Sequence, residues 1–171
     1  MFVKAKQTGK QRVTYWDEDG SVVTYVGGNW TWRNQNPGNI GGGSWATRHG
    51  AIGKAGGFAV FPDYEIGRAA IFELLQGPNF KNETIWDAIA RYAPTEDHND
   101  VKRYRSFVGK VTGLDLTRKI KDLKKEELET LVNAIERFEG KFKPGKIIKT
   151  QKKKKISRIR KDKKGIITEP I

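Results

Sequence analysis

The sequence contains no cysteine among its 171 residues. This absence excludes a disulfide framework, a thiolate metal site and a cysteine nucleophile. Long hydrophobic runs are also missing, because no stretch approaches the roughly 18 continuous apolar residues of a membrane span. The opening segment, MFVKAKQTGK, has no apolar core after its charges, so we expect no secretory signal peptide. Any export would therefore need another route.

An excess of one charge is absent from most of the chain. The formal net charge is +13, but residues 141–171 hold 13 Lys and Arg against two acids, which leaves 20 basic and 18 acidic residues in 1–140. A folded nucleic-acid domain would spread its basic residues over its elements, whereas here they form a run. The sequence therefore predicts a nearly neutral body, a basic C-terminal tail and no specific nucleic-acid partner.

Apolar residues are sufficient for a core: 36% of the chain is hydrophobic, with five Trp, eight Phe and five Tyr. Within 11–26, RVTYW and SVVTYV flank the turn sequence DEDG, which predicts a β-hairpin. The glycine-dense segment 36–57 cannot form a regular helix. Because Trp30, Trp32 and Trp45 accompany it, we expect an ordered loop that packs and lines a site.

Apolar residues at three- and four-residue spacings predict four helices between residues 62 and 140. A capping residue or a helix breaker bounds each of them. In chain order, the predicted helices run from Pro62 to Gly77, from Thr84 to Pro94, from Asp100 to Gly113, and over about 124–139 before the capping Gly140.

One carboxylate of the last helix interrupts its apolar face. In a projection at 100° per residue from Leu128, Glu139 lies at about 20°, inside the apolar stripe, whereas Glu129 and Glu136 lie at or beyond its edge. A carboxyl group on such a face is partly desolvated, and desolvation raises its pKa, as a general acid requires. The alternative is that the helix has already ended at Glu139 and the side chain turns to water.

Three segments together resemble a known family. They are WRNQNPGNI at 32–40, GGFAVFPDYEIGRAAIFELL at 56–75, and the stretch from TIWDAIARYAPTEDHND to LVNAIERFEG that ends at residue 140. Their order is similar to that of the muralytic enzymes of enveloped double-stranded RNA phages and of the lysozyme-like domains of antibacterial effectors. The resemblance implies a lysozyme-like fold, of the lytic transglycosylase and goose-type kind, that degrades peptidoglycan.

The order of these segments implies a circular permutation. In ordinary lytic transglycosylases the helix that ends in the catalytic Glu comes first, whereas here IERFEG comes last, after NPGNI, GAIG, FPDYEIGRAAI and RYAP. The resemblance matches Glu139 to the catalytic acid and implies substrate contacts for Asn36, Asn39 and Tyr92. Turn hydrogen bonds for the two asparagines, and core packing for Tyr92, remain open alternatives.

The patterns and the resemblance together predict a mainly α fold (α+β). We expect a lysozyme-like catalytic domain at 28–140, an N-terminal β-hairpin extension at 1–27 and a Lys/Arg-rich tail at 141–171. The expected reaction breaks the bond between N-acetylmuramic acid and N-acetylglucosamine, either as a muramidase or as a lytic transglycosylase. A hydrolase needs a second carboxylate, for which Asp63 and Glu65 are the candidates; the alternative is that both only stabilise a helix N-terminus.

No cofactor is expected, because His49 and His98 lack a third metal ligand at a suitable spacing. Besides the peptidoglycan glycan, the expected partners are a cognate immunity protein and, through the basic tail, anionic envelope polymers. We expect action in the bacterial periplasm or cell wall, as an antibacterial toxin or phage lysis protein delivered by a secretion system or a phage. The competing hypothesis is a non-catalytic module that binds polyanions or nucleic acid, or that serves in a virion.

Overall fold

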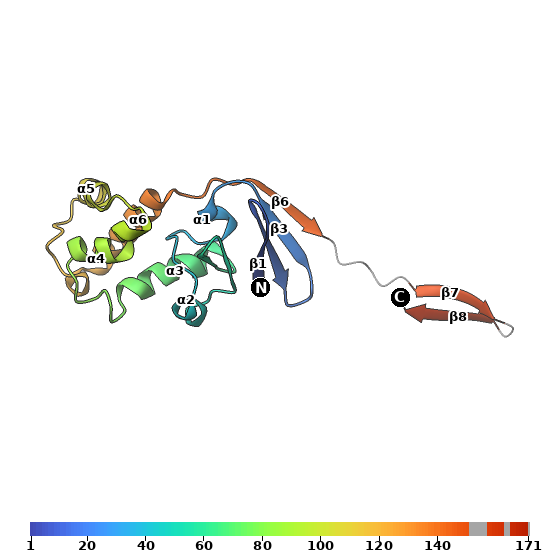
Figure 1. Ribbon diagram of the computed structural model, residues 1–171. Helices are drawn as coiled ribbons and strands as arrows, with labels where there is room; N and C mark the ends of the chain where they lie inside the picture. The colour runs from blue at the N-terminus through green and yellow to red at the C-terminus, as the bar shows by residue number, and fades with distance from the viewer. Residues whose placement is uncertain (151–156, 163–164, 171) are drawn as a thin grey trace.

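The computed structural model describes residues 1–150, 157–162 and 165–170. Figure 1 shows the longer helices gathered in one body and an antiparallel sheet beside it. The sheet has the strand order β1-β2-β3-β6. Its strands are β1 (Phe2–Gly9), β2 (Arg12–Asp17), β3 (Val22–Val26) and β6 (Lys146–Thr150).

The predicted hairpin is confirmed as the β2–β3 pair. Tyr15 lies opposite Val23, and the turn closes with a 2.9 Å bond from the Asp17 amide to the Ser21 carbonyl. Gly20 takes the left-handed conformation that this turn requires, with φ +84°.

The prediction of a mainly α fold is wrong. The described residues form an α+β fold, in which a four-stranded antiparallel sheet accompanies the helices. Strand β1 was not predicted, because only Ala5 among its residues is buried and the segment therefore shows no alternation of apolar residues. Strand β6 lies within the basic segment, yet it pairs with β3 along its whole length. A further antiparallel pair, β7 (Ser157–Asp162) with β8 (Gly165–Pro170), also lies in that segment.

The other elements follow one another between β3 and β6. They are α1 (Trp30–Arg33), α2 (Ser44–Arg48), β4 (Gly53–Ala55), β5 (Phe58–Val60), α3 (Tyr64–Leu75), α4 (Ile85–Tyr92), the 3-10 turn η1 (Thr95–Asp97), α5 (Val101–Thr112), the 3-10 turn η2 (Ile120–Asp122) and α6 (Lys125–Glu139). Strands β4 and β5 form a two-stranded sheet.

The four predicted helices are confirmed as α3 to α6. Asp63, Thr84 and Asp100 each cap a helix by accepting a hydrogen bond from the backbone N–H three residues on. Gly140 ends α6 in the left-handed conformation, with φ +99°. The caps could be predicted from the sequence because each is an interaction between residues close together in the chain.

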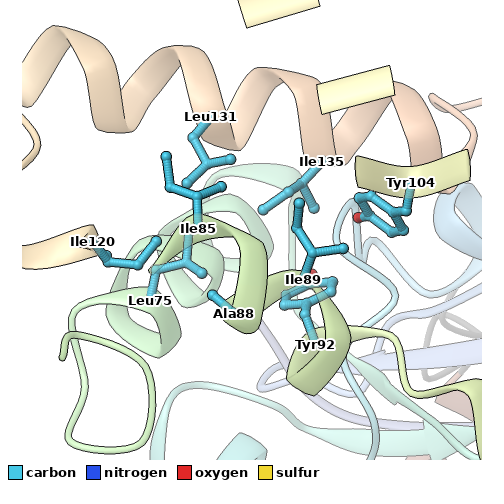
Figure 2. Close-up of a pocket in the computed structure, with 9 residues that line it drawn as sticks. All are labelled: Leu75, Ile85, Ala88, Ile89, Tyr92, Tyr104, Ile120, Leu131 and Ile135. Atoms are coloured by element: carbon cyan, nitrogen blue, oxygen red, sulfur yellow. The ribbon is translucent and has the colours of Figure 1, made fainter. Parts of the chain in front are cut away.

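The helices bury one continuous apolar core. Figure 2 shows a small apolar cavity within it, on the inner face of α6. Nine residues line this cavity: Leu75, Ile85, Ala88, Ile89, Tyr92, Tyr104, Ile120, Leu131 and Ile135. Its two polar atoms, the tyrosine hydroxyls, belong to residues at the end of the cavity farther from Leu131.

Candidate active site

Glu139 is the last residue of α6, and Gly140 turns the chain away directly after it. The side chain is half-buried. Burial raises the pKa of Glu139, because desolvation disfavours the ionised form; hydrogen bonding from Tyr104 and Asn39 opposes this rise. The structure therefore places a partly desolvated carboxyl group where the apolar stripe of the helix predicted one.

Glu139, at the end of α6, lines an open cleft together with three other parts of the chain. The glycine-rich loop and the β4–β5 hairpin contribute mainly small residues, and the segment after α4 contributes polar ones. The residues that line the cleft are Asn39, Gly41, Gly56, Gly57, Phe58, Tyr92, Ala93, Glu96, Asp97, His98, Asn99 and Glu139. The prediction that 36–57 is a loop without helix is wrong in part, because the segment contains the short helix α2 and strand β4. Its residues Asn39, Gly41, Gly56 and Gly57 do line the cleft.

The two asparagines of NPGNI have different environments. Asn36 is buried; its side chain donates to the Ile40 and Ala59 carbonyls, each at 2.9 Å, and accepts from the Ile40 amide at 3.0 Å. Asn39 adopts φ +47° and its Nδ2 lies 3.5 Å from Glu139 Oε1. The structure thus brings Asn39 to the candidate acid, whereas Asn36 holds the loop together from inside.

Tyr92 also lines the cleft, at the end of α4. Its hydroxyl donates a 2.5 Å hydrogen bond to the Gly38 carbonyl, so it connects α4 to the NPGNI loop. A Cβ on Gly38 would lie 2.4 Å from this hydroxyl oxygen, which explains the glycine at that position. Tyr92 is therefore both a core residue and a cleft residue.

Asp63 and Glu65 lie elsewhere. Asp63 caps α3 through a 2.8 Å bond from the Ile66 amide, and Glu65 is exposed in the first turn of the same helix. Neither is among the residues that line the cleft. The carboxylates that share the cleft with Glu139 are Glu96 and Asp97, in η1.

The sequence reasoning did not select Glu96 and Asp97 as catalytic candidates. They belong to the acidic stretch TEDHND, directly after the RYAP segment that the resemblance had matched. The signal was available as two adjacent acids after a helix-ending proline, at a place where loops commonly carry function.

A second carboxylate of α6, Glu136, is buried although the helical projection put it at or beyond the edge of the apolar stripe, so that prediction is wrong. Glu136 is 9% exposed, and it accepts hydrogen bonds from Tyr64 at 2.8 Å and from Arg68 at 2.5 Å. Arg68 also donates to Asn133 at 2.8 Å. Glu136 is thus paired with a cation and joins α3 to α6, whereas no ion pair to Glu139 is found within the described residues.

Asn29 tethers the end of α6 to the N-terminal part of the chain. Its Nδ2 donates to the carbonyls of Gly140 and Lys141 at 2.6 and 2.8 Å, and its Oδ1 accepts from the Trp32 and Lys143 amides, each at 3.1 Å. One side chain therefore caps α1 and fixes the chain immediately after Glu139. No local pattern in the sequence indicates this contact across 111 positions.

The remaining candidates have structural surroundings. Trp32 is buried and its ring lies 4.8 Å from that of Tyr25, while Trp45 stacks on His49 at 4.0 Å. His49 pairs with Glu73. In the part of the chain that the structure describes, no group of three or more His, Cys, Asp or Glu side chains is placed to hold a metal ion.

None of the described helices is long and apolar enough to cross a membrane. The chain was compared with protein-family models and with curated proteins, and none of them matches it.

Proposed function

We propose that this protein is a peptidoglycan-degrading enzyme that cleaves the bond between N-acetylmuramic acid and N-acetylglucosamine, with Glu139 as the general acid. The observation that carries the proposal is the position of Glu139: half-buried, without a paired cation among the described residues, and open to a cleft. The family resemblance supplies the substrate class.

The chemistry requires a protonated carboxyl group beside the glycosidic oxygen. The leaving oxygen must receive a proton while positive charge develops on the sugar ring, and a carboxyl group keeps that proton near neutral pH only if its pKa is raised. Desolvation supplies this for Glu139. Glu136 is instead engaged by Arg68 and Tyr64, and it is not among the residues that line the cleft.

The composition of the cleft suits a bulky saccharide. Gly41, Gly56 and Gly57 present backbone rather than side chains along it, and polar groups are available from Asn39 and Asn99. Adding a Cβ to Gly41 would meet no atom within 4 Å, so the space beside it is open. Sugar rings can therefore approach the backbone closely and form hydrogen bonds with it.

A general acid at Glu139 is compatible with two reactions, which differ in the group that attacks the sugar. A lytic transglycosylase uses a hydroxyl of the substrate as nucleophile, whereas a muramidase needs a second carboxylate to activate water or to trap the sugar. In this cleft Glu96 and Asp97 replace Asp63 and Glu65 as the candidates for that second role.

Mass spectrometry of the soluble products from purified peptidoglycan tests the proposal. We expect glycan fragments from the wild type and none from Glu139→Gln. Glu129→Gln is the matched control, because Glu129 is an exposed carboxylate of the same helix. Reducing ends would identify a hydrolase, and anhydro-muramic ends a transglycosylase. Cleaved peptides with intact glycan strands would contradict the proposal.

The associated biology is part of the same proposal. A wall-degrading enzyme of this kind would act in the periplasm or cell wall as an antibacterial toxin or phage lysis protein, and a toxin's producer would need a cognate immunity protein. Retention on anionic envelope polymers through the basic segment 141–171 would favour its action.

A second candidate, polyanion binding without catalysis, is favoured by the 13 Lys and Arg of residues 141–171. Such binding weakens steeply as salt rises. Binding to purified walls or nucleic acid that survives Glu139→Gln, in a protein that releases no glycan, would select this candidate over the enzyme.

A further inference from the structure

Two tyrosines share the end of the apolar cavity below α6, Tyr92 from α4 and Tyr104 from α5 (Figure 2). Burial raises the pKa of both hydroxyls well above its ordinary value, so both are neutral hydrogen-bond donors at physiological pH. Their partners differ. The Tyr92 hydroxyl donates to the Gly38 carbonyl at 2.5 Å, whereas the Tyr104 hydroxyl has no hydrogen-bond partner of regular geometry among the described residues.

The Tyr104 side chain is held firmly at this position. The residue is 1% exposed, and its ring stacks on Phe138 with the ring centroids 3.8 Å apart and an interplanar angle of 30°. Phe138 directly precedes Glu139 on α6. A buried hydroxyl that lacks a partner costs stability, so it calls for an explanation.

The charge of Glu139 contributes to the raised pKa of the Tyr104 hydroxyl, and this hydroxyl in turn lowers the pKa of Glu139, so the two groups influence each other across the α5–α6 contact. Asn39 reaches the same carboxylate with Nδ2 at 3.5 Å from Oε1. Two neutral donors, from α5 and from the NPGNI loop, therefore converge on one carboxylate.

We infer that Tyr104 is a positioning residue for Glu139, whose hydroxyl, together with the Asn39 amide, holds the carboxylate toward the cleft and stabilises it after it has given up its proton. This inference rests on the proposed function, in which Glu139 donates that proton. The 3.5 Å separation of Asn39 Nδ2 from Glu139 Oε1 is long for a hydrogen bond, and catalytic hydrogen bonds of this kind shorten in the complex with substrate.

Opposing effects on the pKa of Glu139 determine the direction in which this pKa should change when the Tyr104 hydroxyl is removed. Burial disfavours the ionised carboxylate and the two donors favour it, so removing one donor raises the pKa of Glu139. The other titratable groups around it are Tyr92, Glu96, Asp97 and His98 in the cleft, with Glu136 and Arg137 on α6. Removing only the Tyr104 hydroxyl leaves all of these in place.

The test is a titration of Glu139 followed by NMR in protein labelled with ¹³C-glutamate, with the resonance assigned by its loss in Glu139→Gln. In Tyr104→Phe we expect the pKa of Glu139 to rise by roughly 0.5 to 1 unit, the effect of one hydrogen bond to a half-buried carboxylate. Tyr64→Phe is the matched control: it removes a tyrosine hydroxyl that donates to Glu136, the other partly or fully buried carboxylate near the end of α6, and should leave the pKa of Glu139 unchanged.

The kinetic readout follows from the same direction. A general acid is active in its protonated form, so kcat/KM falls as the pH rises through the pKa of Glu139. This alkaline limb should move to higher pH in Tyr104→Phe by the same amount, with a lower kcat and an unchanged KM. Thermal unfolding should not occur at a lower temperature, because the substitution keeps the ring and its stacking on Phe138.

An unchanged pKa of Glu139 in Tyr104→Phe, or equal shifts in the two tyrosine variants, would overturn the inference. The titration does not depend on turnover. A wild type that releases no glycan would therefore contradict the proposed function, while the NMR result would still decide whether Tyr104 acts on Glu139.

Discussion

Replacing Asn29 tests how the end of α6 is held in place. The side chain caps α1 and donates two hydrogen bonds to the chain after Glu139, at 2.6 Å and 2.8 Å. Loss of an N-cap costs about 1 kcal/mol. Each hydrogen bond contributes about 0.5 to 1.5 kcal/mol, toward the lower end where it is exposed. We therefore expect Asn29→Ala to lower the free energy of unfolding by about 2 to 3 kcal/mol.

Asn29→Ser separates the two contributions. Serine still caps α1 but is too short to reach Gly140 and Lys141, so this variant should lose only the part due to the tether, about 1 to 2 kcal/mol. Denaturant unfolding measures both values. A change below about 0.5 kcal/mol in Asn29→Ala, the range of an ordinary surface substitution, would refute the tether. Equal losses in the two variants would show that only the contacts to the chain after Glu139 matter.

Three further predictions concern stability and the cleft. Arg68→Leu leaves Glu136 buried without its cation and should lower the free energy of unfolding by about 3 kcal/mol; adding Glu136→Leu should restore most of it, and a double variant no more stable than the single one would argue against the pair. Gly41→Leu points into open space, so it should leave the unfolding temperature unchanged while lowering glycan release at least about tenfold, or about 1.4 kcal/mol; full activity would place the substrate elsewhere. Because burial raises the pKa of Glu139, its ionisation costs folding free energy above the ordinary carboxyl pKa. Glu139→Gln should therefore be more stable than the wild type at pH 7, and the difference should vanish below about pH 4; a difference that persists there would refute the desolvation argument.

The helices could be predicted from the sequence because their signals are local. Asp63, Thr84 and Asp100 each cap the helix that follows within three residues, and Gly140 ends the last one. Amphipathic spacing then selects which face is buried. The same reasoning placed Glu139 inside the apolar stripe, where the side chain is half-buried. It also put Glu136 at or beyond the edge, but that side chain is buried.

The sheet could not be predicted beyond its hairpin, because its outer strands carry no clear pattern. Strand β1 buries only Ala5, and β6 is exposed throughout and rich in lysine. Pairing of β6 with β3 joins residues 120 or more positions apart, for example Val22 with Thr150. Such pairing depends on the whole fold, so composition made this segment resemble a tail.

Sequence patterns indicated some residues of the candidate cleft, whereas the residues that enter it through long-range contacts could not be predicted. Glu139 and Asn39 belong to recognisable local patterns, and the structure brings them together. Asp63 was a candidate because it is acidic and close to the glycine loop along the chain. In the structure its side chain instead accepts the hydrogen bond from the Ile66 amide that caps α3. Glu96 and Asp97 enter the cleft only because α4 ends beside the NPGNI loop, a tertiary contact fixed by the bond from Tyr92 to Gly38.

The most direct test of the central claim is the rate of glycan release from purified peptidoglycan by the wild type, Glu139→Gln and Glu129→Gln. If Glu139 is the general acid, its replacement should reduce kcat/KM by about 100- to 10,000-fold, the usual contribution of general acid catalysis, while Glu129→Gln keeps the wild-type rate. Equal rates for the wild type and Glu139→Gln would contradict the account.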